Sequence, residues 1–545
     1  MLPRNDAVAT LTSEPFDVLV IGGGITGAGV ALDAATRGYS VALVERADFA
    51  SGTSSRSSKL VHGGLRYLQN FDLGLVREAL LERQINVNLA PHLVKPLRFV
   101  VPAFEGARLD RIVGLGLNAY DVMAVERLRR RRARGESDWS PARHRVIAGD
   151  EVTELIPALA DRAPTGGYLF YDCQTDDARL VLTVLAEAER FGAVAANRLE
   201  AVELLSDGGR AAGACLRDVE SGDELEVRAA NVVNATGVWA DRLRPAELHD
   251  EAEVPVIRPS RGTHVVVEDG KLPMGAGAIV PAGEGRTIFV LPWLGQTLIG
   301  TTDTDHDGDA DHVRPSHAEI EYLLDAVNAF FGTALAPADL AGAYAGVRPL
   351  ISGSGDRGKS VDISRKAELY ETSSGMVTIT GGKLTTWRRM AKQTVDRIVE
   401  RDGSDARCVT HEIPLGMAVA PEDLTTAPAA ARAQLAGRYG HLAHDVLALA
   451  AQRPELLEPI VVGRPDLLAE AAYAARREQA RTVGDVLLRR TRLGLTAARA
   501  LLAPGGDAIE RVAAAAGEEL GWDDARRARE AQAFRDEARE EGILP

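Results

Sequence analysis

A glycine-rich turn near the start of the chain has the residue types and the spacing that bind a pyrophosphate. Residues Gly22–Gly27 read GGGITG, follow the apolar run Val18–Ile21 and lead into small apolar residues at helical spacing. Gly22 permits a tight turn, Gly24 lets a pyrophosphate approach the backbone, and Gly27 lets helix and strand pack closely. The N-terminus of the predicted helix offers unpaired N–H groups and a partial positive charge to the anion. The turn therefore predicts a dinucleotide site, with contacts at Gly22, Gly24, Ile25, Thr26 and Gly27.

A glutamate follows the second predicted strand of the same unit. The apolar run Val41–Val44 ends on Glu45, where a carboxylate can accept hydrogen bonds from a ribose diol. This position favours an adenosine without a 2′-phosphate. A glycine-rich turn in an ordinary βαβ unit is the alternative, and the strand, the helix and the acid together argue against it. They leave open whether the dinucleotide is NAD or FAD.

The polar segment after Glu45 distinguishes between these cofactors. Residues Ala50–Leu68 read ASGTSSRSSKLVHGGLRYL and are dense in Ser, Thr and Gly, with basic residues between them. A nicotinamide domain does not need such a run, whereas a flavin needs hydroxyl and amide donors along its pyrophosphate and ribityl chain, and glycines against its ring. A flexible polar loop is the alternative. The segment favours FAD, with candidate contacts at Ser54, Ser55, Ser58, Lys59, His62, Gly63 and Gly64.

Together, the turn, Glu45 and the string SSKLVHGGLRYL resemble the N-terminal part of the FAD-dependent glycerol-3-phosphate dehydrogenases. This is the aerobic, membrane-associated type within the glycine-oxidase/D-amino-acid-oxidase group of flavoproteins. The resemblance extends over nearly the whole chain, and its other specific motifs are GVRPL at 346–350 and TGGKLTTWR at 380–388. An ATG turn at 235–237 resembles the turn by which this fold closes around its dinucleotide. These stretches add Gly237, Gly382, Leu384 and Thr385 to the implied cofactor contacts.

The resemblance also implies which residues meet the substrate. In the family, the histidine that matches His264 lies near the substrate, and Arg348 matches a position at the reacting hydroxyl. A phosphate dianion calls for convergent cations, and arginine offers it a planar bidentate fork. Taken singly, a lone histidine is more often structural, and a lone basic residue is more often a salt-bridge partner. The implied catalytic residues are Arg348 and His264, and the implied substrate contacts are Arg66, Tyr67, Arg365 and Lys383.

The implied reaction is the oxidation of sn-glycerol 3-phosphate to dihydroxyacetone phosphate. A hydride would move to the flavin, and the electrons would pass to a membrane quinone. The catalytic base is open between His264 and a neighbouring group or water, and no sequence feature marks a quinone pocket. The alternatives are a flavin oxidase of the same fold that uses dioxygen, on glycerol phosphate or an amine, a nicotinamide-linked dehydrogenase, and a flavoprotein that only binds.

Composition narrows the class of protein. The chain has 545 residues, of which 46% are hydrophobic and 26% charged, as in an ordinary globular protein of two or three domains. A formal net charge of −15 argues against a general nucleic-acid binder. The cysteines Cys173, Cys215 and Cys408 are few and scattered, which predicts no disulfide framework and no metal site and fits a reducing cytoplasm. The first residues do not resemble a signal peptide, and no run of 18 apolar residues occurs, so we expect no membrane span.

A basic cluster suggests contact with a membrane surface. An apolar stretch beginning near Arg111 leads into the arginines between Arg127 and Arg134. Such a cluster beside an amphipathic helix suits an anionic membrane surface, and a solvated helix end is the alternative. The resemblance favours peripheral contact with the inner face of the plasma membrane. A homodimer is compatible with the sequence, which does not decide the oligomeric state.

The predicted fold is α/β, with a Rossmann-type FAD-binding domain, an inserted, mainly antiparallel β substrate domain and a C-terminal helical domain. The FAD-binding domain takes residues 14–90, 166–250 and 341–405, the substrate or membrane-facing segment takes 91–165, the β domain 251–340 and the helical domain 406–545. We expect Arg261 and His264 on opposite faces of one strand, because they are three residues apart. For Asp172, Asp176 and Asp177, helix capping and salt bridges are favoured over a carboxylate pair or a metal site. No chemistry beyond packing is predicted for the helical domain.

Overall fold

The computed structural model describes residues 1–64, 73–105, 111–132, 143–243, 256–283, 285–352 and 367–544. Its first sheet has the strand order β17-β18-β10-β1-β2-β7, and the neighbours of β1 run parallel to it. The hairpin of β8 and β9 extends β10. The strands are β1 (Phe16–Ile21), β2 (Val41–Val44), β7 (Val194–Ala196), β8 (Leu199–Asp207), β9 (Arg210–Asp218), β10 (Glu224–Asn234), β17 (Ala367–Glu371) and β18 (Val377–Gly381).

Both faces of the parallel central strands are buried, which explains why the buried part of β1, Val18–Ile21, is a continuous apolar run. Val18 and Val20 pack toward three adjacent helices, whereas Leu19 and Ile21 face the N-terminal helix and the β8–β9 hairpin. The strand, turn, helix and strand predicted around Gly22–Gly27 are confirmed. The covering helices are α1 (Arg4–Leu11), α2 (Ile25–Thr36), α7 (Asp177–Arg190) and α9 (Trp387–Arg401).

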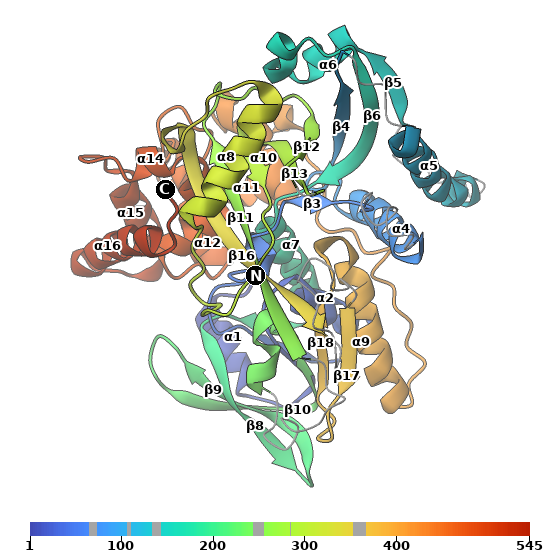
Figure 1. Ribbon diagram of the computed structural model, residues 1–545. Helices are drawn as coiled ribbons and strands as arrows, with labels where there is room; N and C mark the ends of the chain where they lie inside the picture. Colours follow the sequence, from blue (N-terminus) through green and yellow to red (C-terminus); the bar gives the residue numbers. More distant parts are fainter. Residues whose placement is uncertain are drawn as a thin grey trace.

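The second sheet is mainly antiparallel and lies above the first in Figure 1. Its order is β15-β11-β14-β13-β12-β4-β6-β3, with β16 paired to β11 and β5 to β6. The helix α8 (His317–Phe331) begins at a capping box of Ser316 and Glu319 and covers one face. The strands are β3 (Leu60–Val61), β4 (Lys95–Ala103), β5 (Arg145–Ala148), β6 (Gly166–Gln174), β11 (Val256–Val267), β12 (Gly277–Pro281), β13 (Thr287–Trp293), β14 (Gln296–Gly300), β15 (Thr304–Asp305) and β16 (Leu340–Ser352).

The mainly antiparallel second sheet agrees with the predicted fold class, and it contains more of the chain than the predicted insertion. Strands β3 to β6 belong to it although they lie outside 251–340, and β16 begins at residue 340 and runs beyond it. These strands join the sheet through hydrogen bonds to distant parts of the chain, and no local sequence pattern predicts such pairings. The domain boundaries themselves stay predictions.

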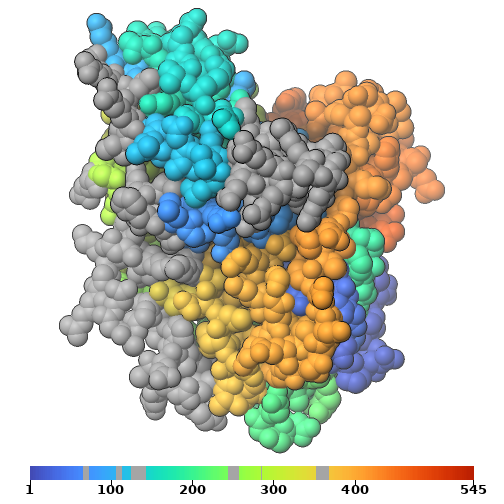
Figure 2. Space-filling view, turned by 90° about the vertical axis from the view of Figure 1, so that its right-hand side faces the viewer, coloured from blue at the N-terminus to red at the C-terminus, as the bar shows by residue number. Residues whose placement is uncertain are grey.

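Two helices pack against each other beside β6 of this sheet. They are α4 (Leu73–Leu89) and α5 (Arg111–Arg132), and α6 (Gly149–Leu155) packs against β6. On the face shown in Figure 2, the α4–α5 region (blue to cyan) lies beside the segment that includes α9 (orange), to which α4 is bonded. Among the helices that the structure describes, none is long and apolar enough to cross a membrane.

The C-terminal part is helical, as predicted, and packs on the face of the second sheet opposite α8. In Figure 1 these helices are coloured orange to red. A π-helix, η12, interrupts their regular geometry just before residue 491. They are α10 (Ala429–Tyr439), α11 (Ala443–Ala448), α12 (Leu468–Arg477), η12 (Asp485–Arg490), α13 (Leu493–Thr496), α14 (Ala498–Leu501), α15 (Ala508–Leu520) and α16 (Asp524–Glu540).

Candidate active site

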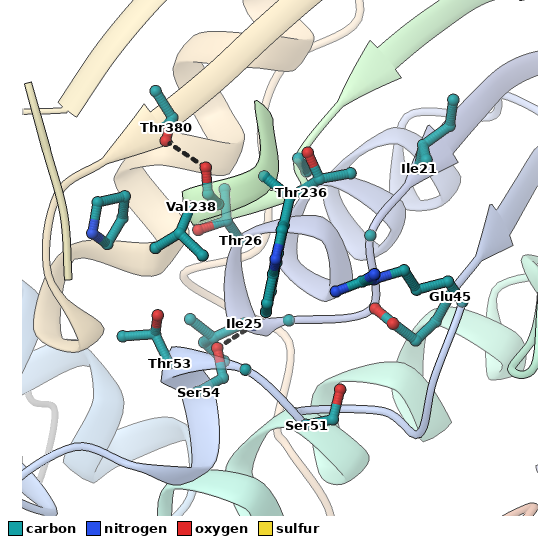
Figure 3. Close-up of a pocket in the computed structure, with 18 of the residues that line it drawn as sticks. Ile21, Ile25, Thr26, Glu45, Ser51, Thr53, Ser54, Thr236, Val238 and Thr380 are labelled. Atoms are coloured by element: carbon teal, nitrogen blue, oxygen red, sulfur yellow. Dashed lines mark hydrogen bonds between the residues drawn. The ribbon is translucent and has the colours of Figure 1, made fainter. Parts of the chain in front are cut away.

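A pocket of ≈ 430 Å³ opens at the carboxyl ends of the central strands of the first sheet. Ile21 of β1, Val44 of β2 and Thr380 of β18 line it, together with Ala235 just after β10. Figure 3 shows hydroxyl-bearing Ser51, Thr53 and Ser54 along one wall, with Thr236 and Thr380 across the pocket from them. Open parallel sheets bind ligands at this edge.

The glycine turn forms the base of this pocket. Gly22 has a φ of +115°, and a Cβ there would lie 2.6 Å from the Ala235 carbonyl oxygen. A Cβ on Gly27 would collide with the carbonyl of Gly22, so strand and helix approach as closely as the motif requires. The Ile25 N–H at the start of α2 donates to Ser54 Oγ at 3.0 Å. Gly24 and Thr26 line the pocket beside this helix end.

Glu45 forms a second wall, and its carboxylate is held by the backbone. It accepts from the Gly23 N–H at 2.7 Å and from the Ala47 N–H at 2.9 Å. Burial raises the pKa of Glu45, and these two N–H groups oppose that shift. The next residue, Arg46, stacks its guanidinium 4.6 Å above the Trp239 ring. The acid is thus oriented before any ligand arrives.

Several predicted cofactor contacts line this pocket, and the others are not among its lining residues. Those that line it are Gly22, Gly24, Ile25, Thr26, Glu45, Ser54, Gly237, Gly382 and Leu384. Of these others, the His62 N–H donates to Thr385 Oγ1 at 3.0 Å, and the Gly63 N–H donates to Tyr120 Oη at 2.9 Å. Ser55 is buried, and Gly64, at a φ of +76°, ends this described stretch.

Sequence reasoning missed further lining residues. Ser51, Thr53 and Ser57 belong to the same Ser/Thr-rich segment, whose composition could have included them. Leu199–Val202, from the start of β8, carries no motif that could have predicted its place in the wall.

Lys59 is fully buried, and its ammonium points to a carboxylate rather than into the pocket. It donates to Asp177 at 2.8 Å and to the Ser55 carbonyl at 2.5 Å. Burial lowers the pKa of Lys59 from 10.5 to about 8, although Asp177 opposes the shift. Asp176 caps α7 by accepting from the Arg179 N–H, as predicted for this acidic pair. A direct cofactor contact by Lys59 stays a prediction.

His264 lies on β11 in a buried aromatic setting. Its Nε2 is 2.8 Å from Ser58 Oγ, and its ring stacks on Tyr344 at 4.8 Å between centroids. Burial, together with the cations of Lys59 and Arg348, holds the pKa of His264 well below its usual 6.5, so the imidazole is neutral near pH 7. The ring lies where a side chain on Gly300 of the neighbouring β14 would stand.

The predicted opposition of Arg261 and His264 is confirmed. Arg261 pairs with Glu319 of α8 at 3.0 Å, on the face of β11 that α8 covers. His264 faces the other way, toward Ser58 and Tyr344. The alternation of side chains along a regular strand is sufficient to explain this.

Arg348 lies on the same face of the sheet as His264. It stands on β16 opposite Ser260, whereas Tyr344 stands opposite His264. Its Nη2 donates to Thr301 Oγ1 at 3.0 Å and to the Thr302 carbonyl at 3.2 Å. The guanidinium thus lies over β11 between Ser260 and His264, where Gly262 has no side chain.

The other predicted substrate contacts divide between described and undescribed parts of the chain. Lys383 follows β18 and lines the pocket beside Gly382. Arg66, Tyr67 and Arg365 lie outside the described residues, so their roles stay predictions. Within the described ranges, no group of three or more His, Cys, Asp or Glu residues could hold a metal ion.

The residues of the pocket fit a flavin adenine dinucleotide. The N-terminal end of α2, where Gly24 and Thr26 line the pocket, suits a pyrophosphate, and the Glu45 carboxylate suits a ribose diol. Leu199 and Val202 provide an apolar wall for a base, while Gly382 and Leu384 bring the end of β18 to the same pocket. A plain turn-and-loop structure would not need this combination of donors, acid and glycines.

Comparisons with known proteins agree with this site. Residues 17–396 match the family described as "FAD dependent oxidoreductase", and residues 376–527 match "C-terminal domain of alpha-glycerophosphate oxidase". The chain is 40% identical over 534 residues to "Glycerol-3-phosphate dehydrogenase 2" of Mycobacterium tuberculosis, which covers 95% of this chain and 88% of that protein. It is 37% identical to "Glycerol-3-phosphate dehydrogenase SDP6, mitochondrial" of Arabidopsis thaliana, over 96% of this chain and 86% of that protein.

Solved structures show the same architecture. The glycerol-3-phosphate dehydrogenase from Bacillus halodurans, complexed with FAD, superposes with a TM-score of 0.76 at 29% identity, covering 99% of this chain and 97% of that one. Glycine oxidase from Geobacillus kaustophilus shares the fold at a TM-score of 0.50 and 21% identity, over 75% of this chain and 100% of that one. The predicted fold class and the predicted FAD cofactor are confirmed.

Proposed function

This chain belongs to the FAD-dependent oxidoreductase family, and from that premise we propose that it oxidises sn-glycerol 3-phosphate to dihydroxyacetone phosphate and passes the electrons to a membrane quinone. The names of its relatives and its match to the C-terminal domain of alpha-glycerophosphate oxidase support this substrate. The single observation that carries the chemistry is the placement of neutral His264 and cationic Arg348 on one face of the second sheet.

The two side chains suit the oxidation of a secondary alcohol. Bound FAD supplies the hydride acceptor. The alcohol must also lose its hydroxyl proton, and a neutral imidazole can accept it. Among the described residues, His264 Nδ1 is buried without a hydrogen-bond partner, while Nε2 is bonded to Ser58. A substrate hydroxyl would provide that missing partner.

Arg348 suits the role of stabilising the developing alkoxide rather than that of a base. Its guanidinium stays charged at all working pH values, and the hydroxyl and carbonyl of Thr301 and Thr302 hold it in place. Lys383, in the described wall of the pocket, would meet the substrate phosphate together with Arg66, Arg365 and Tyr67. Convergent cations of this kind explain a preference for a phosphate ester over free glycerol.

A product assay tests the reaction. FAD-loaded protein is incubated with sn-glycerol 3-phosphate and a water-soluble quinone, and dihydroxyacetone phosphate is measured; glycerol replaces the phosphate ester in the control. We expect one product molecule per quinone reduced, and none from glycerol. An amine that turns over while the phosphate ester does not would overturn the substrate assignment.

A glycerol phosphate oxidase is a second candidate, because the C-terminal match carries the name of an oxidase. The two differ in the acceptor that reoxidises the flavin. We expect the soluble quinone to reoxidise the reduced enzyme faster than air-saturated buffer does. Hydrogen peroxide formed in proportion to product, with no acceleration by quinone, would favour the oxidase.

Contact with the inner face of the plasma membrane is part of the same proposal. Leu115 and Val122 on α5 are 73% and 69% exposed, and their spacing of seven residues puts them on one helix face. Leu73 of α4 and Val146 of β5 are also exposed, and α5 leads into the arginine-rich sequence. Apolar side chains beside basic ones suit anionic lipid.

A vesicle assay tests this contact. The protein should sediment with vesicles that contain phosphatidylglycerol and remain in solution with purely zwitterionic vesicles. The double variant Leu115→Asp/Val122→Asp should weaken the binding at unchanged activity toward a soluble quinone. Equal sedimentation of the wild type and this variant would contradict the assignment of α5.

A further inference from the structure

A buried arginine of the C-terminal helical part reaches out of it toward the cofactor segment. Arg492 follows the π-helix η12 and has a left-handed φ of +67°. Its Nη1 donates to the Leu488 carbonyl at 2.8 Å, which anchors the side chain in its own domain. Its Nη2 donates to Asp176 Oδ1 at 2.7 Å and also pairs with Asp177 at the start of α7.

Asp177 also forms hydrogen bonds with the Ser/Thr-rich segment. Its fully buried carboxylate accepts from the Ser57 N–H at 3.1 Å and from the Ser57 hydroxyl at 2.7 Å. The Lys59 ammonium donates to the same carboxylate at 2.8 Å. Arg492 itself lies 3.4 Å from the Ser55 carbonyl. The segment from Ser55 to Lys59 is therefore bound to the Asp177 carboxylate, which is itself paired with Arg492 of the C-terminal helical part.

Two routes lead from this backbone to His264. Ser58, between the two residues bound to Asp177, places its Oγ 2.8 Å from His264 Nε2. Tyr344, whose ring stacks on His264, donates its hydroxyl to the Ser57 carbonyl at 2.8 Å. Ser57 also lines the cofactor pocket. A displacement of Ser57 would thus change both the Ser58–His264 hydrogen bond and the Tyr344–His264 ring stack, which orient the imidazole.

The buried ions make this arrangement rigid. Each member has been withdrawn from water, so removing one partner leaves an uncompensated charge in a medium of low dielectric constant. Two cations, Arg492 and Lys59, face the Asp176–Asp177 pair, and the charges balance locally. Although burial would raise the pKa of Asp176, Arg492 holds it well below its usual range.

We propose that Arg492 is a positioning residue of the active site, which through Asp177 fixes Ser57 and Ser58 and thereby the imidazole of His264. The inference rests on the proposed function for the role of His264. The C-terminal helical part would then help to position a catalytic residue, whereas the sequence predicted only packing for it.

The same interface offers a matched control. Arg179 of α7 and Glu478, which follows α12, form a buried bidentate pair between the same two parts of the chain. Within the described part of the chain, neither residue forms a hydrogen bond with Ser55–Lys59. Arg179→Lys and Arg492→Lys both keep a positive charge and lose a planar fork, so they weaken the interface in the same way.

The test compares both variants as FAD-loaded, full-length protein. We measure thermal stability, FAD content and the anaerobic rate of flavin reduction by sn-glycerol 3-phosphate across pH. Arg492→Lys should slow reduction at saturating substrate at least about tenfold and shift the acid limb of the pH profile, because small misplacements of reacting groups are costly. Arg179→Lys should stay within about twofold of the wild type at a similar loss of stability. Equal rates and equal pH profiles in the two variants would overturn the proposal.

A spectroscopic measurement and a second variant distinguish a failure of this inference from a failure of the proposed function. The His264 ring signal, identified in ¹⁵N-histidine-labelled protein by its loss in His264→Gln, should change in Arg492→Lys and not in Arg179→Lys. This readout needs no turnover, so it decides the inference even if the wild-type flavin is not reduced and the proposed function fails. If Arg492→Lys does not fold, Ser57→Ala takes its place, and a His264 signal identical to that of the wild type would overturn the proposal.

Discussion

The guanidinium carbon of Arg348 lies 2.8 Å from the point at which a Cβ on Gly262 would stand. Gly262 lies between Ser260 and His264 on one face of β11, and Arg348 stands opposite Ser260 on β16. Four residues along a strand span about 13 Å, so a guanidinium can approach His264 only by lying along the sheet. The missing side chain of Gly262 provides the space in which it does so.

Gly262→Ala should therefore impair activity far more than stability. The added methyl group would meet the end of the flexible Arg348 side chain and the Thr301 hydroxyl, which can move aside at a cost of about 1 kcal/mol. The displaced guanidinium should slow flavin reduction by about 100-fold. Gly116→Ala on α5, where a Cβ meets open space, is the control, and equal rates in the two variants would contradict the assigned place of Arg348.

Glu45→Gln should weaken FAD binding. The carboxylate accepts from two backbone N–H groups, and an amide can satisfy only one of them before its own NH₂ opposes the other. We expect the dissociation constant for FAD to rise about 10- to 100-fold, which corresponds to about 1.4–3 kcal/mol. Quenching of flavin fluorescence measures it.

Glu200→Gln is the matched control for Glu45→Gln. Glu200 lines the same pocket but pairs with Arg217 at the exposed edge of the β8–β9 hairpin. An exposed pair of this kind contributes about 0–1 kcal/mol, so FAD affinity should change little. A loss of affinity as large as that of Glu45→Gln would show that general charge, and not the oriented carboxylate, governs binding.

Lowering the pH should destabilise the wild type more than His264→Gln. The pKa of His264 in the folded protein lies well below its unfolded value near 6.5, because the ring is buried and cations lie nearby. Between these two pKa values the unfolded chain binds more protons than the folded protein. The contribution of the neutral His264 ring to the free energy of unfolding is therefore fully present above pH 6.5 and is lost as the pH falls. The difference should approach about 1.4 kcal/mol per pH unit below pH 6.5. Thermal midpoints at pH 7.5 and 5.5 test it, and parallel losses in both proteins would contradict it.

Tyr120→Phe should loosen the chain at Gly63. The Tyr120 hydroxyl accepts from the Gly63 N–H and donates to Asp172 Oδ1 at 2.7 Å, and Arg83 pairs with the same carboxylate. The variant leaves the N–H with a weaker contact to Asp172 at 3.2 Å, at a cost of about 1 kcal/mol.

Tyr168→Phe controls for the loss of a phenolic hydroxyl. Tyr168 is also largely buried, and its hydroxyl makes no hydrogen bond within the part of the chain that the structure describes. Its thermal midpoint should match that of the wild type, whereas that of Tyr120→Phe should fall. Equal midpoints in all three proteins would show that the Gly63 contact contributes nothing.

Local periodicity explains which parts of the fold could be predicted. The turn at Gly22–Gly27, the C-terminal helices and the opposed faces of Arg261 and His264 follow from patterns of two or 3.6 residues and from glycine geometry. These features need no knowledge of distant parts of the chain.

Contacts between distant segments explain what could not be predicted. Ser58 contacts His264 and Lys59 contacts Asp177, 206 and 118 residues away, while their predicted contacts with the cofactor stay predictions. Arg492 reaches Asp177 across 315 residues. Such pairings are set by tertiary packing, which the types and spacing of neighbouring residues do not encode.

The most direct test of the proposed chemistry is the visible spectrum of FAD-loaded protein under anaerobic conditions, recorded during the addition of sn-glycerol 3-phosphate. We expect that the oxidised-flavin band bleaches, that glycerol leaves it unchanged, and that deuterium at C2 of the substrate slows the bleaching. A flavin that stays oxidised in excess sn-glycerol 3-phosphate would contradict the proposed oxidation of this substrate.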